Sequence, residues 1–193
     1  MRSFLIGSAI SLAFVTSASA HPAILHGLSF AAGVAHPLSG LDHITAMVAV
    51  GLWAAIKGDR ALWLWPLTFV AVMLVGGVLG MSNIPIPFVE PGILASVLVL
   101  GLMVTFAVNP PTWFGAGLIG VFALLHGHAH GTEAAQTVNG LEYVAGFVVA
   151  TVALHAVGIV VGLTLKRTAA DQISRLAGVA CTAVGVGLCA GVL

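Results

Sequence analysis

The chain is organised around an eight-residue stretch between two apolar segments, His36-Pro37-Leu38-Ser39-Gly40-Leu41-Asp42-His43. This stretch places two imidazoles and one carboxylate at the start of an apolar run. Ionisable groups at membrane depth are costly, so they usually face a cavity, an ion path or one another. Histidine and aspartate together also form a ligand set for a borderline divalent metal. The stretch therefore predicts a polar site inside an apolar protein.

The composition is that of an integral membrane protein. The 193 residues are 60% hydrophobic and 6% charged, whereas water-soluble domains carry about 25% charged residues. We therefore expect an all-α bundle with the lipid bilayer as its partner. The formal net charge is zero, so nucleic acid is not an expected partner.

Residues 1–20 have the order of a secretory signal peptide. Arg2 is followed by an apolar run and then by small residues up to Ala20, which is the pattern of a cleavable signal. We expect cleavage after Ala20, so that residues 21–193 form a single transmembrane domain with its N-terminus outside.

The remaining chain predicts one short half-helix and six membrane spans. Residues 23–35 are apolar over about half a crossing, and His36-Pro37 and Ser39-Gly40 interrupt them. Irregular backbone at membrane depth persists only where protein or water satisfies it. Six further segments have roughly spanning length: 40–56, 61–82, 88–108, 112–130, 139–165 and 174–193.

The positions of the basic residues predict the topology. Apart from Arg2, every Lys and Arg lies in two connections, which contain Lys57 and Arg60, and Lys166, Arg167 and Arg175. Four predicted spans separate these connections, so they lie on the same side. The positive-inside rule makes that side cytoplasmic, which agrees with an external N-terminus.

A second polar cluster ends the predicted span 112–130, with the sequence His126-Gly127-His128-Ala129-His130-Gly131-Thr132-Glu133. On a helix, His126, His130 and Glu133 share one face, whereas His128 points about 200° away. Asp42 and His43 are adjacent and should diverge by about 100°. The predicted topology puts both clusters on the outer face, where they would form one site.

These two motifs together resemble the HupE/UreJ family of nickel and cobalt transporters. The family's first motif, a histidine followed after five residues by Asp-His, corresponds to His36 through Asp42-His43. Its second motif, Phe-His-Gly-x-Ala-His-Gly-x-Glu, corresponds to residues 125–133, with Leu125 in place of Phe. The resemblance covers essentially the whole chain. It implies uptake of Ni²⁺ or Co²⁺ across the bacterial inner membrane, with six metal-site residues: His36, Asp42, His43, His126, His130 and Glu133.

Four other residues are weaker candidates for metal contacts. His21 would become the N-terminal residue after cleavage, and His26 follows it on the outer side. Glu90 precedes Pro91 at the start of a predicted span, where it can equally complement a helix N-terminus. His155 lies in the middle of the span 139–165 and is either a second binding station or a histidine bonded to a neighbouring helix.

Several function classes remain as alternatives. An intramembrane zinc hydrolase could use His126 and His130 with a carboxylate, although the sequence lacks His-Glu-x2-His, and a haem-binding bundle is a further alternative. We expect a non-enzymatic transporter without a prosthetic group, and no ATP-binding P-loop is present. The spacing of glycines such as Gly76 and Gly80 suits either close packing within one chain or a homo-oligomer.

Overall fold

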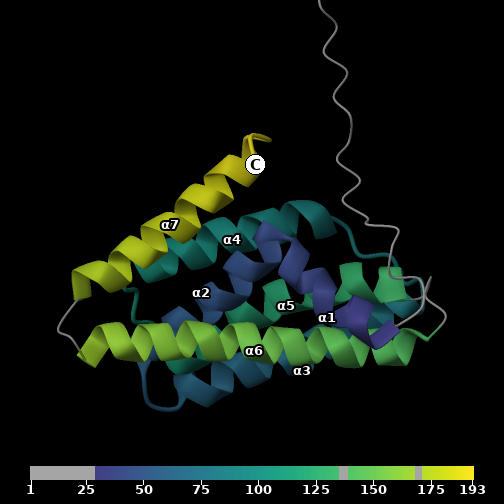
Figure 1. The fold of residues 1–193 in the computed structure, drawn as a ribbon, viewed down its shortest axis with the longest axis horizontal. Coiled ribbons are helices and arrows are strands. Elements are labelled where there is room, and N and C mark those ends of the chain that lie inside the picture. Colours follow the sequence, from purple (N-terminus) through teal and green to yellow (C-terminus); the bar gives the residue numbers. More distant parts are fainter. Residues whose placement is uncertain (1–28, 135–138, 168–170) are drawn as a thin grey trace, which may run out of the picture.

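The computed structural model describes residues 29–134, 139–167 and 171–193. Over these ranges the chain is all-helical, as predicted, and contains no strand. In Figure 1, α6 runs along the bundle, α4 and α7 lie along the opposite edge, and α2 and α5 lie between them. The helices are α1 Ser29–Ser39, α2 Leu41–Lys57, α3 Ala61–Met81, α4 Val89–Thr105, α5 Thr112–Ala134, α6 Gly140–Arg167 and α7 Asp171–Cys189.

The break between α1 and α2 falls at Gly40. Its backbone is extended, with φ −101° and ψ 124°, and the two helices meet at an 80° bend. The prediction that His36-Pro37 also interrupts the half-helix is wrong, because α1 continues through Pro37 to Ser39. At its end the Ser39 hydroxyl donates a hydrogen bond to the His36 carbonyl at 2.7 Å. Gly40 therefore makes the turn by itself.

Within the described ranges two helices, α3 and α6, are long and apolar enough to cross a membrane, and the bent pair α1 and α2 makes a third candidate if counted as one span. Helix α4 and residues Arg175–Cys189 are shorter apolar helices. The bounds of α2 to α7 agree with the six predicted segments within about four residues. The count of six spans stays a prediction.

Glycines bring α3 and α5 into backbone contact. A Cβ on Gly127 would overlap the Met73 carbonyl, and one on Gly131 would overlap the Gly77 carbonyl. In return, a Cβ on Gly76 would overlap the Leu124 carbonyl. Small residues allow this approach because no side chain separates the helices. Gly76 and Gly80, whose spacing also suited a homo-oligomer, thus pack against another helix of the same chain.

Helix α6 packs in the same way against α1 and α2. A Cβ on Gly33 would overlap the Tyr143 carbonyl, and one on Gly51 would overlap the His155 carbonyl. A Cβ on Gly158 would in turn overlap the Val48 carbonyl. Helices α1, α2 and α6 therefore form one tightly packed unit, and α3 and α5 form another.

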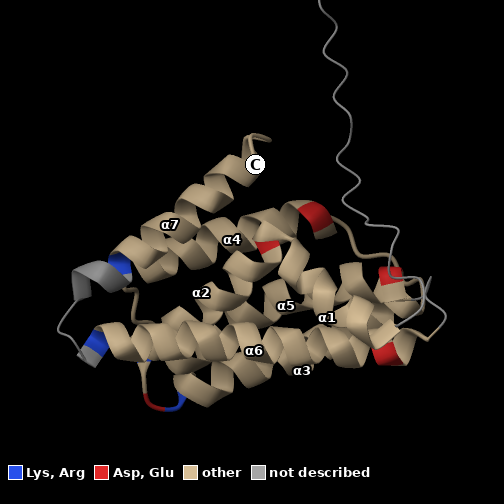
Figure 2. Cartoon of the chain, viewed as in Figure 1, with Lys and Arg blue, Asp and Glu red and all other residues tan. Residues whose placement is uncertain are grey.

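The basic side chains gather at one end of the bundle (Figure 2). The described Lys and Arg residues lie at the end that holds the α2–α3 connection, the end of α6 and the start of α7. Lys57 Nζ donates to Asn109 Oδ1 at 2.6 Å, and Lys166 Nζ donates to the Ile56 carbonyl at 3.3 Å. The acidic residues at the start of α4, the end of α5 and the start of α6 lie at the opposite end. The two basic connections thus share one end, as the sequence predicted.

Candidate metal centre

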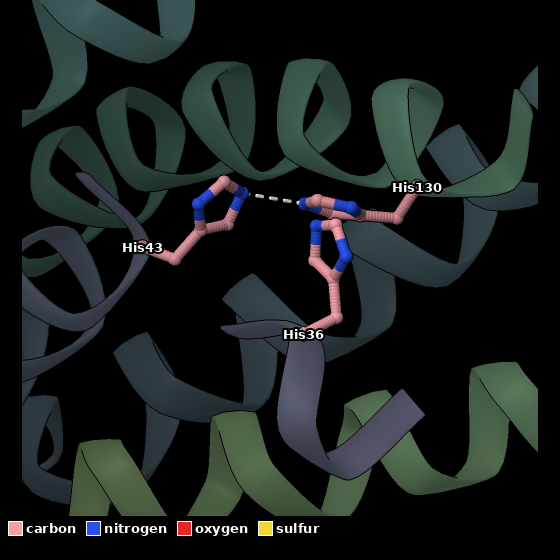
Figure 3. A group of neighbouring side chains, drawn as sticks. All are labelled: His36, His43 and His130. Atoms are coloured by element: carbon pink, nitrogen blue, oxygen red, sulfur yellow. Dashed lines mark hydrogen bonds between the residues drawn. The ribbon is translucent and has the colours of Figure 1, made fainter. Parts of the chain in front are cut away.

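Three histidines from three helices converge near the acidic end of the bundle. Figure 3 shows His36 from α1, His43 from α2 and His130 from α5 with their rings directed toward one another. One ligand nitrogen from each lies within 4.8 Å of the others. His43 and His130 are 7% and 5% exposed, and His36 is half-buried. The bend at Gly40 brings His36 back over the start of α2.

The closest contact in the group joins His43 and His130. Their Nε2 atoms are 2.6 Å apart. On the far side of each ring the Nδ1 atom meets a carboxylate: His43 Nδ1 lies 2.7 Å from Asp42 Oδ1, and His130 Nδ1 lies 3.1 Å from Glu133 Oε2. Ionised carboxylates only accept hydrogen bonds, so both Nδ1 atoms donate. In the neutral rings, both Nε2 atoms then carry lone pairs that point into the space they share.

Glu133 links side chains from three of the helices around this group. Its Oε2 accepts hydrogen bonds from His130 and from the Tyr143 hydroxyl, each at 3.1 Å. The same oxygen lies 3.3 Å from His36 Nε2. One carboxylate thus holds side chains from α1, α5 and α6 around the histidines.

Asp42 differs from the prediction made from helical phase. Adjacent residues diverge on a helix, yet Asp42 Oδ1 accepts hydrogen bonds from both the ring and the backbone N–H of His43, the latter at 2.9 Å. Asp42 lies in the first turn of α2, where backbone N–H groups are still unpaired and attract a carboxylate. The carboxylate therefore turns toward its neighbour.

His126 lies one helical turn deeper than His130. It is fully buried, and its Nδ1 donates to the Phe122 carbonyl at 2.9 Å. This bond leaves the lone pair on Nε2, for which the described part of the chain offers no hydrogen-bond partner. Its ring centroid is 5.4 Å from that of His43. His128 instead donates from Nε2 to the Ile84 carbonyl at 2.7 Å, so it faces away from the group.

The structure adds two aromatic residues that the sequence analysis did not single out. Tyr143, the only tyrosine in the chain, bonds to Glu133, and the Phe147 ring packs on His130 with centroids 4.2 Å apart. Both come from α6. Neither belongs to the two histidine motifs, and only the scarcity of tyrosine in the sequence could have drawn attention to Tyr143.

Two of the weaker candidates, Glu90 and His155, lie outside this group. Glu90 is exposed in the first turn of α4, and His155 is buried further along α6. His21, His26 and the predicted signal peptide, residues 1–20, fall outside the described residues.

The comparisons with known proteins give the chain a family. Residues 9–188 match the family described as HupE / UreJ protein. The chain is also similar to Protein HupE of Rhizobium leguminosarum bv. viciae, with 46% identity over 181 residues that cover 94% of each chain. No solved structure gives a significant match. With a match over most of its length and a relative of this similarity, the chain belongs to the HupE/UreJ family.

Proposed function

We propose that this chain is a secondary transporter that takes up Ni²⁺ or Co²⁺ through the histidine group. One observation carries the proposal: His43 and His130 oppose their Nε2 atoms at 2.6 Å while each Nδ1 meets a carboxylate. Metal-binding histidines almost always donate their second ring N–H in this way, which fixes the tautomer and raises the basicity of the ligand. Two lone pairs at this distance repel each other unless a cation lies between them.

The charges and the ligand types suit a divalent ion. Asp42 and Glu133 together balance a charge of two, and histidine nitrogens are ligands for nickel, cobalt and zinc. Nitrogens bound about 2.0–2.1 Å from one ion at a right angle are roughly 3 Å apart, so the pair must open by roughly 0.4 Å to accept it. The choice of nickel or cobalt rests on the family resemblance.

In this proposal the chain crosses the bacterial inner membrane six times, after removal of residues 1–20. The end with the basic residues lies in the cytoplasm, and the histidine group opens to the outer side. The ion and the lipid bilayer are the partners, and a homo-oligomer is not needed to complete the histidine group. The absence of a P-loop from the sequence supports transport that is not driven by ATP in this chain.

Neither the family match nor the relative supports the zinc hydrolase considered from the sequence. A hydrolase would also use a carboxylate at the metal, whereas Asp42 and Glu133 both accept hydrogen bonds from ring Nδ1 atoms. We therefore propose that the protein is not an enzyme.

The test is nickel flux into proteoliposomes that contain the purified full-length protein, with ⁶³Ni²⁺ outside and Co²⁺ or Zn²⁺ as competitors. We expect saturable uptake that His43→Ala abolishes and His128→Ala preserves at equal protein content. Absence of flux in the wild type, or flux unaffected by His43→Ala, would overturn the proposal.

A further inference from the structure

His155 is a buried histidine, and neither nitrogen of its ring has a hydrogen-bond partner among the residues that the structure describes. It lies near the middle of α6 and is 1% exposed. A polar atom buried without a partner costs free energy that an apolar ring of similar shape would avoid. The imidazole at this position therefore destabilises the fold, and packing alone does not account for it.

A series of rings joins His155 to the histidine group. The Phe69 ring of α3 lies 5.0 Å from the His155 ring and 5.7 Å from the His126 ring, between centroids. His126 in turn contacts His43 and holds its own unpartnered Nε2. Two buried imidazoles, His126 with one unpartnered nitrogen and His155 with two, thus flank the same aromatic side chain.

The positions on α6 give the depth of His155. Phe147 packs on His130, and His155 follows eight residues later, which is about 12 Å along a helix. The direction is toward the end of α6 that carries Lys166. His155 therefore lies below the histidine group on the way to the basic end of the bundle.

From this geometry we propose that His155 is a second, inner binding station for the transported divalent cation. The ion reaches it from the His43–His130 pair by way of His126 Nε2 and past the Phe69 ring. The inference rests on the proposed transport function and deepens it, because it assigns a path inward from the outer group.

The neighbours of His155 suit brief occupancy. Thr151 lies one turn earlier on α6, and its hydroxyl is 3.9 Å from the Met73 sulfur. One imidazole with weak oxygen and thioether donors nearby binds a cation less tightly than the outer group, which has three histidines and two carboxylates. Transport needs sites that bind well enough to be filled and weakly enough to be emptied, so an inner station should be the weaker one.

The test compares wild type, His155→Phe and His155→Leu as full-length proteins in lipid, with Ni²⁺ alone as the probe. Ser96→Ala is the matched control, since it removes a buried hydroxyl whose hydrogen bond stays within α4, to the Ile93 carbonyl. Equilibrium ⁶³Ni²⁺ binding should show a tight phase and a weaker phase in the wild type and in the control. Both His155 variants should lose only the weaker phase, and their flux at saturating nickel should fall by about tenfold or more.

Thermal unfolding separates this role from a structural one. His155→Phe should unfold at or above the wild-type temperature, because it removes two unpaired polar atoms, and His155→Leu provides a second variant if the larger ring is not accommodated. A single binding phase in the wild type, or unchanged flux in a folded His155 variant, would overturn the inner station. Absence of nickel binding and flux in the wild type would instead overturn the transport function as well.

Discussion

His43 and His130 are 87 positions apart in the chain, and their Nε2 atoms lie 2.6 Å apart in the fold. Each ring is held from behind by its own carboxylate, Asp42 or Glu133. Two helices thus present equivalent imidazole–carboxylate units to one another, one from each sequence motif. The pair brings the two sequence motifs together in space.

Substitution of the facing histidines should remove tight metal binding. We expect His43→Ala and His130→Ala to lower nickel affinity by more than the roughly 10- to 100-fold that losses around a ligand typically cause. His128→Ala is the control on the same helix, because its ring bonds to the Ile84 carbonyl instead. Isothermal titration with Ni²⁺ at equal amounts of folded protein measures the difference. A His128 variant as weak as the His130 variant would contradict the assignment.

The carboxylates should have a smaller, graded effect. Asp42→Asn and Glu133→Gln keep an acceptor for the ring N–H but lose the charge, so we expect affinity to fall about 10- to 100-fold. Tyr143→Phe removes one hydrogen bond to Glu133 and should have less effect than Glu133→Gln. Full loss of binding in Asp42→Asn at normal protein levels would indicate that this carboxylate contacts the ion directly.

Much of the fold could be predicted because apolar runs bounded by turn formers set the helices. The segment 61–82 corresponds to α3, Ala61–Met81, and 139–165 corresponds to α6, Gly140–Arg167. The charge pattern also predicted that Lys57 and Lys166 share one end. These features depend on local composition and on the number of predicted spans between two connections, and both can be read from the sequence.

The details of the site depend on contacts that sequence spacing does not contain. Helical phase gives the direction of a Cβ atom, but side-chain rotation brought Asp42 to His43 despite their divergence. Tyr143 and Phe147 reach the histidines from α6 only because glycines let that helix approach. The break at Gly40 rather than Pro37 reflects the competition between two residues that both disfavour helix.

The α3–α5 contact predicts a sharp difference between two glycines of α5. In Gly127→Ala the new Cβ would overlap the Met73 carbonyl, and we expect destabilisation of about 1–3 kcal/mol because the backbone must shift. Gly117 has nothing within 4 Å of its Cβ position, so Gly117→Ala should stabilise the helix by about 0.5–1 kcal/mol. Thermal unfolding in detergent measures both. Equal tolerance would argue against direct backbone contact.

Cysteine labelling tests the orientation in the membrane. Arg60 is exposed at the basic end, and Glu142 is exposed at the start of α6. In a background with Cys181 and Cys189 replaced by serine, a membrane-impermeant maleimide added to intact cells should label Glu142→Cys but not Arg60→Cys. Opening the cells should expose the second site. The reverse pattern would invert the topology and the direction of transport.

Apart from α4 and α7, which pack on each other through glycines of their own, the glycine contacts divide the helices into two halves, with α3 and α5 in one and α1, α2 and α6 in the other. His130, His126 and Phe69 belong to the first half, and His36, His43 and His155 belong to the second. The seam between the halves therefore passes through the outer group and the inner station alike. Any motion that separates the halves also separates His43 from His130. An ion bound between these two rings therefore holds the halves together, and separating the halves requires that ion to lose a ligand.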